Sequence, residues 1–198
     1  MRTYELIAFQ WSCHTIHKLG ATPVHSEWIH TGQKFPNPSE FPNFEFARSL
    51  MNQIGTTGTP FMWAKHENTV LRTILNQMEI FQVYDELLKG WLNDITSHGD
   101  KEGRLVDMNK MTQDHYFHPY MKGKTSIKKV LPAVWSHNPY LHAVEHFKDY
   151  APDAFLGGIL DPYDTLTSGI NEAEWDDEVV SGGTAAMRAY HRIRFDDM

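Results

Sequence analysis

Two kinds of apolar pattern alternate along this chain, and their order limits the folds that it can adopt. Short apolar runs predict strands at residues 4–16, 22–30, 61–64 and 104–107. Apolar residues at helical spacing predict helices at residues 44–54, 67–78, 79–95, from 127, from 139 and at 184–193. Two early strands followed by strand–helix units predict an α/β fold: a mixed sheet flanked by helices, with antiparallel strands at one edge.

The size and composition of the chain fit one globular domain. It has 198 residues, of which 41% are hydrophobic and 22% charged, so we expect a single domain over residues 1–198. An acidic, loop-like stretch with the runs DPYD and EWDDE predicts an insertion at about residues 138–180. No apolar run approaches the ~18 residues of a membrane helix, and the lone Cys13 suits a reducing compartment. We therefore expect a cytoplasmic protein without a membrane segment.

The formal charge of the chain is −7. This balance argues against a protein whose main role is a non-specific grip on a nucleic-acid backbone, because lysine and arginine supply that grip. It does not argue against a metal-dependent nuclease, in which acids hold the cations that contact phosphate. The 12 histidines are scattered without cysteine partners, so the sequence does not predict a structural zinc site.

Two acidic residues follow predicted strands. Glu67 lies just past the run FMWA, at a predicted helix start, and Asp107 ends the run RLVD. Ligands of open α/β sheets bind at the carboxyl ends of the strands, so both are candidate site residues. Each also has a structural alternative. Glu67 would complement the dipole of its helix, and Asp107 would cap a helix that begins at Met108.

Residues 107–134 bring acids, histidines and lysines close together, as phosphate and divalent-metal chemistry requires. His115 and His118 would share one face of a helix, but Pro119 equally favours an extended segment or a turn, and both suit a hydrogen-bonding role. Lysines then gather around a glycine turn and a helix capped by Ser126; they are Lys122, Lys124, Lys128 and Lys129. They form either a solvated surface or a phosphate contact, since exposed N–H groups at a helix start attract anions.

Seven sequence blocks give the chain a family resemblance. They are IAFQWSCH, FMWAKHENTVLRTIL, LVDMNKM, HYFHPYMKGKTSIKKVLPAV, NPYLHAVEHF, DPYDTL and GGTAAMRAYHRI. In order and spacing they resemble a bacterial domain-of-unknown-function family of DnaQ-like, RNase H-fold 3′–5′ exonucleases. The fourth block is the most specific. The resemblance implies an RNase H-like fold and hydrolysis of nucleic-acid phosphodiesters with Mg²⁺ or Mn²⁺.

In DnaQ-like enzymes two cations are held by four acids: Asp-x-Glu on the first strand, one acid after a central strand, and one on a late helix. Only Glu67 corresponds, as catalytic residue and metal ligand, and Trp63 replaces the asparagine expected before it. Asp107 is a further candidate ligand. The Asp-x-Glu strand is expected before Tyr4 and the late helix after Met198, and this sequence contains neither. We therefore expect an incomplete RNase H-like sheet and no exonuclease activity from this chain alone.

Two functions remain open. One is the nuclease-type domain, in which the residues that position the nucleic acid would be His115, His118, Lys124 and Lys128, and Phe117 or Tyr120 would stack on bases. The other is a non-catalytic protein-interaction or assembly module with the same fold. An incomplete sheet leaves residues 6–13 and 61–64 with unpaired edges, so we expect a homodimer or a partner protein to complete it. The sequence does not distinguish DNA from RNA as a partner.

Overall fold

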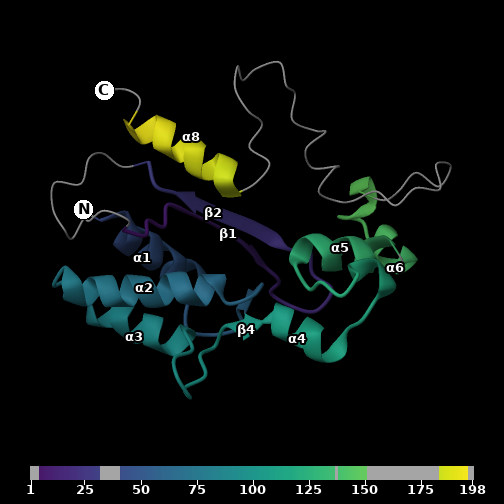
Figure 1. Cartoon of the computed structure of the whole chain (residues 1–198), viewed down its shortest axis with the longest axis horizontal. Helices are drawn as coiled ribbons and strands as arrows, with labels where there is room; N and C mark the ends of the chain where they lie inside the picture. The colour runs from purple at the N-terminus through teal and green to yellow at the C-terminus, as the bar shows by residue number, and fades with distance from the viewer. Residues whose placement is uncertain (1–4, 32–40, 137, 151–182, 196–198) are drawn as a thin grey trace. The chain divides into compact units, whose positions relative to one another are not determined.

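The chain has a mixed α/β structure. A computed structural model describes residues 5–31, 41–136, 138–150 and 183–195 (Figure 1). Its contacts divide the chain into two compact units, Met1–Tyr116 and Phe117–Met198, and each is described by itself. The predicted α/β class is confirmed, whereas the RNase H-like topology and the single domain remain predictions. Among the described residues, no helix is long and apolar enough to cross a membrane.

The described part of the first unit contains two pairs of strands and four helices (Figure 1). In chain order they are β1 (Gln10–Thr15), β2 (Val24–Ile29), α1 (Pro42–Ile54), β3 (Phe61–Met62), α2 (His66–Ile80), α3 (Glu86–Ile95), β4 (Val106–Asp107) and α4 (Met108–His115). The order agrees with the sequence prediction, and the strands are shorter than their apolar runs.

Strands β1 and β2 form an antiparallel hairpin that contacts α1. Trp11 lies opposite Trp28, and both pack against the hydrophobic core. The Trp11 indole N–H also donates to the Ser49 hydroxyl of α1 at 3.1 Å. Exposed and half-buried residues alternate along β1, which is the period of two expected when one face of a strand is covered.

Helices α1, α2 and α3 pack on one another and form the core of the first unit (Figure 1). Its fully buried apolar side chains include Phe44, Ile74, Leu88, Leu92 and Ile95. Ile74 belongs to the apolar spacing that predicted α2, and Leu88, Leu92 and Ile95 recur at helical spacing along α3. A helix covers such an apolar stripe by packing it on its neighbours.

The prediction of a continuous helix over residues 79–95 was wrong at its start. Helix α2 runs on to Ile80, and α3 begins only at Glu86. The intervening turn has Gln82 in the left-handed region, with φ 54°. The Asp85 carboxylate caps α3 by accepting from the Leu88 N–H at 3.0 Å. An aspartate at this position favours a new helix start over a continuous helix.

Two buried amide side chains bind the backbone of the segment that precedes β1. Asn43 of α1 is fully buried and Gln77 of α2 is 2% exposed. Asn43 Oδ1 accepts from the Ala8 N–H at 2.7 Å, and its Nδ2 donates to the Leu6 carbonyl at 2.9 Å and to Gln77 Oε1 at 2.6 Å. Gln77 Nε2 donates to the same Leu6 carbonyl at 3.2 Å. The two amides thus satisfy backbone groups that a neighbouring strand would otherwise pair.

The described strands form two separate sheets, where the sequence predicted one mixed sheet. Strand β3 pairs with β4 in parallel, with Phe61 opposite Val106 and Met62 opposite Asp107. The predicted buried strand over residues 61–64 has only two residues, and although Met62 is buried, Phe61 is 59% exposed. A two-residue strand offers too few ladder hydrogen bonds to join the two pairs.

The second unit is largely helical in its described part. Its elements are the 3-10 helix η2 (Pro119–Met121), α5 (Ile127–Ser136), α6 (Pro139–His142), the 3-10 helix η3 (Lys148–Tyr150) and α8 (Gly183–Phe195). Helix α5 contacts η2 and α6. Asn138 caps α6 by accepting from the Leu141 N–H at 3.3 Å, but α6 is a single turn, shorter than the helix predicted through Phe147. Most of the predicted insertion, from residue 151 to 180, lies outside the described residues.

Candidate functional site

The turn after β3 is held by a carboxylate from the next strand. Ala64 adopts a left-handed conformation with φ 67°, which costs about 1 kcal/mol or more for a residue with a side chain. Its N–H donates to Asp107 Oδ1 at 3.1 Å. Because β3 and β4 are parallel, the turn after β3 and the end of β4 lie at the same end of the small sheet. Asp107 therefore holds the loop that leads to Glu67.

Asp107 is also the N-cap of α4, as one sequence alternative proposed. Its Oδ1 accepts from the Asn109 N–H at 2.9 Å and from the Lys110 N–H at 3.2 Å. With the Ala64 contact, three backbone N–H groups point at one oxygen atom. The cap is therefore confirmed, while the metal-ligand role of Asp107 remains a prediction.

Glu67 lies in the first turn of α2, and its side chain is exposed. An acid in this position complements the positive end of the helix dipole. Within the described parts of the chain, no group of three or more His, Cys, Asp or Glu side chains could hold a metal ion. Glu67 therefore has no neighbouring set of ligands there, and its catalytic and metal-binding roles remain predictions.

His115 and His118 do not lie on one helix. His115 is the last residue of α4, and Tyr116 after it is extended. His118 is extended with φ −142° and caps η2, where its Nδ1 accepts from the Tyr120 N–H at 3.3 Å. The imidazole of His118 also stacks on the Tyr120 ring, with 5.5 Å between centroids and 22° between planes. Of the two conformations that the sequence left open, the extended one is observed at His118.

The lysines gather around the turn between η2 and α5. We call Lys122, Lys124, Lys128 and Lys129 the basic surface; all four side chains are exposed. Lys122 and Gly123 both have positive φ, 49° and 72°, which turns the chain tightly into α5. Met121 and Val130, which flank this turn in sequence, are both buried. Their burial holds the backbone that carries the four exposed lysines.

Charge is segregated along this part of the chain. From Phe117 to Val144 the sequence contains the four lysines of the basic surface and neither Asp nor Glu, although the whole chain carries −7. Exposed aromatic rings lie in the same segment: Phe117 is 79% exposed and Tyr120 51%. Lysines together with exposed rings can contact both the phosphates and the bases of a nucleic acid.

Ser126 stands where the sequence placed a helix cap. Its carbonyl accepts from the Lys129 N–H at 2.8 Å and from the Val130 N–H at 3.0 Å, which are the first hydrogen bonds of α5. Lys128 and Lys129 therefore sit in the first turn of this helix. Their charges add to the positive end of its dipole, which strengthens attraction for an anion at this position.

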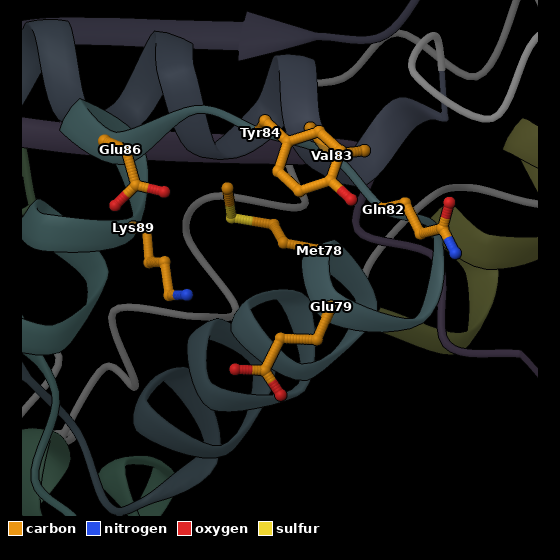
Figure 2. Close-up of a pocket in the computed structure, with 7 residues that line it drawn as sticks. All are labelled: Met78, Glu79, Gln82, Val83, Tyr84, Glu86 and Lys89. Carbon is orange, nitrogen blue, oxygen red and sulfur yellow. The ribbon is translucent and has the colours of Figure 1, made fainter.

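A small hollow lies at the turn between α2 and α3 (Figure 2). It has a volume of about 110 Å³ and is lined by Met78, Glu79, Gln82, Val83, Tyr84, Glu86 and Lys89. None of the predicted site residues lines it.

One ion pair of the first unit was not predicted from the sequence. Arg48 Nε of α1 donates to Asp85 Oδ2 at 2.8 Å. The hydrogen bond from Arg48, and then the one from the Leu88 N–H, lower the pKa of Asp85 below its ordinary value. The pair joins α1 to the start of α3. The residues are 37 positions apart, so no local pattern reveals it.

Comparison with known proteins identifies the family. Residues 1–126 match the family described as "Domain of unknown function (DUF2779)", and the chain belongs to it. No curated protein and no solved structure shows significant similarity to the chain. Membership of a domain-of-unknown-function family, which the sequence blocks predicted, is thereby confirmed. The DnaQ-like relationship remains a prediction.

Proposed function

We propose that this member of the DUF2779 family is a nuclease-type domain of DnaQ-like kind whose own contribution is to bind nucleic acid. The observation that carries the proposal is the basic surface, with Lys122, Lys124, Lys128 and Lys129 exposed around one turn and no acid between Phe117 and Val144. In a chain of net charge −7 this segment is where a polyanion meets the least repulsion.

The physical model of binding uses two kinds of contact. The lysine ammonium groups and the first turn of α5 contact phosphates, which gives affinity without reading sequence. The exposed rings of Phe117 and Tyr120 stack on bases, which requires bases that are not already paired in a duplex. We therefore expect single-stranded nucleic acid to bind more tightly than duplex.

The described residues do not fit the two-metal chemistry that the resemblance implies. Two cations about 3.5–4 Å apart need several carboxylates converging on one place. Glu67 is exposed in a helix turn, and one Asp107 oxygen already accepts from three backbone N–H groups. We derive no hydrolytic step through Mg²⁺ or Mn²⁺ for this chain and expect it to bind nucleic acid without cleaving it.

Binding is tested by fluorescence anisotropy with a labelled single strand of about 16 nucleotides, as DNA and as RNA, against salt. Lys124→Ala with Lys128→Ala removes two phosphate contacts, and the slope of log K against log salt should fall by about 1.4. A matched double variant, Lys18→Ala with Lys110→Ala, removes the same charge from the first unit and should leave the slope unchanged. Equal effects of the two pairs would show that only net charge matters and would refute the basic surface.

Cleavage is tested separately. The unmodified chain is incubated with the same strands in Mn²⁺, and the products are resolved on a gel. We expect no degradation. Degradation that disappears in Glu67→Ala would show that the chain assembles a metal centre, and it would replace binding by hydrolysis as its function.

A further inference from the structure

The hairpin has two outer strand edges, one on β1 and one on β2, and the edge on β1 is the one of interest. The His30 N–H donates to the Phe9 carbonyl at 2.7 Å, so Phe9 and His30 stand at a hydrogen-bonded position of the antiparallel ladder. Because such pairs alternate along an antiparallel ladder, Trp11, Cys13 and Thr15 also direct their backbone groups toward β2. The peptide groups of Gln10, Ser12 and His14 then point away from β2, at the outer edge of β1.

This edge is closed at one end and open at the other. Leu6 and Ala8 belong to the same outward row, and the buried amides of Asn43 and Gln77 satisfy their backbone groups. Beyond Ala8 the row continues with Gln10, Ser12 and His14, where the described residues include no neighbouring strand. An incoming strand thus has about five residues of β1, from Gln10 to His14, on which to pair.

The open part of the edge lacks two of the devices that prevent strand addition, proline and the charged side chains of Asp, Glu, Lys and Arg. Residues 10–15, QWSCHT, contain no proline and no Asp, Glu, Lys or Arg. The opposite edge of the hairpin, on β2, carries Glu27 and is preceded by Pro23. Charged side chains and proline are the usual protection of sheet edges, so the hairpin is protected on its β2 side and unprotected on its β1 side.

We propose that the outer edge of β1 pairs with the same edge of a second copy of this chain, as antiparallel strands with a two-fold axis at Ser12. This register places Ser12 opposite Ser12 and Gln10 opposite His14. All three outward residues of one copy then meet outward residues of the other, giving about six backbone hydrogen bonds. An unprotected row that is complementary to itself fits an isologous dimer, in which one patch serves both subunits.

In this register the core-facing sides of the two hairpins lie on the same face of the joined sheet. A two-fold axis perpendicular to the sheet turns Trp11 and Cys13 of both copies toward the α1 side, where Trp11 already packs against the core. The outer faces, with Ser12 and His14, stay exposed on the other side. The result is a four-stranded antiparallel sheet in the order β2–β1–β1–β2 with helices on one face, which continues the alternation already present in β1.

Cross-linking tests the register directly. In a Cys13→Ser background, Ser12→Cys places two thiols on opposite strands at about 5.5 Å between Cα atoms, within disulfide reach. Glu27→Cys in the same background is the matched control, because Glu27 lies directly opposite Ser12 in the hairpin but on the protected edge. We expect a disulfide-linked dimer from Ser12→Cys under mild oxidation and little from Glu27→Cys.

Light scattering tests the dimer without cross-linking. The unmodified chain should approach twice its mass of 22.9 kDa at micromolar concentration. Ser12→Lys, which sets two like charges against each other at the axis, should return it to the monomer, whereas Glu27→Lys should not. A monomer at all accessible concentrations, or equal cross-linking at both cysteine positions, would overturn the proposal. So would slow amide exchange at Gln10, Ser12 and His14 in a monomer, because the edge would then be closed within one chain.

Discussion

Asn43→Ala should be among the most destabilising single substitutions in the first unit. Asn43 is fully buried and makes three hydrogen bonds through one small amide. The substitution leaves the Ala8 N–H and Gln77 Oε1 buried without their partner, whereas the Leu6 carbonyl keeps its bond from Gln77 Nε2. The loss is thus concentrated in two groups.

The magnitude follows from those two groups. Each buried polar group left without a partner costs about 1–3 kcal/mol, so the two together cost about 2–6 kcal/mol. Alanine is the better helix former, which returns about 0.5 kcal/mol at this position in α1. We expect a loss of about 3 kcal/mol, which for a chain of this length corresponds to a fall in Tm of about 6–12 °C.

The assay is urea unfolding followed by far-ultraviolet circular dichroism and by tryptophan fluorescence, which also checks that the two probes report one transition. Asn52→Ala is the control, because Asn52 lies exposed on the same helix and its loss should change the free energy of unfolding by less than about 0.5 kcal/mol. If Asn43→Ala behaved like Asn52→Ala, the amide network would not hold the segment before β1 against α1 and α2. The reasoning that Asn43 and Gln77 occupy the backbone groups of Leu6 and Ala8 at the β1 edge would then be refuted.

Three further predictions concern the first unit. Leu92→Ala, at a fully buried position, should lower the free energy of unfolding by about 2–5 kcal/mol in the same urea assay, whereas exposed Leu87→Ala should change it little. Asp107→Ala should cost about 1–2 kcal/mol through loss of the α4 cap, and Asp107→Asn should recover most of it; equal losses in both would contradict a capping role. The Arg48 hydrogen bond lowers the pKa of Asp85. The ionised carboxylate therefore stabilises the folded chain above the ordinary pKa of aspartate in the unfolded chain, and this contribution is lost as pH falls through the lower folded pKa. The acid limb of a stability–pH curve should therefore flatten in Asp85→Asn and remain in Glu86→Gln.

Local patterns predicted most elements of the first unit, and the errors have local or long-range causes. The spacing of Phe46, Leu50 and Ile54 gives α1 nearly at its observed bounds, because a helix that packs on a core must repeat its apolar residues. The break before α3 was missed although Asp85 is a good cap, since the apolar spacing continues across it. Local capping chemistry outweighed periodicity at that point.

The contacts of the backbone before β1 could not be predicted from the sequence. They are made by the buried amides of Asn43 and Gln77, which come from two helices and lie more than 30 residues apart in the chain. An asparagine or glutamine in a helix pattern reads as a surface residue, because most are exposed. Only tertiary contacts show that these two replace part of a strand ladder.

At the candidate site, the sequence predicted where a residue lies in the fold better than it predicted what that residue binds. The sequence predicted Asp107 at the end of a strand, and in the structure Asp107 ends β4, where it also accepts from the Ala64 N–H. A residue at a strand end that precedes a helix also meets unpaired backbone N–H groups, and a carboxylate satisfies these without a metal. The lysines differ, because four of them are exposed around a single turn, at Lys122, Lys124, Lys128 and Lys129. Their concentration in a segment without acids is therefore the stronger pointer to an external ligand, and the ligand that matches it is a polyanion.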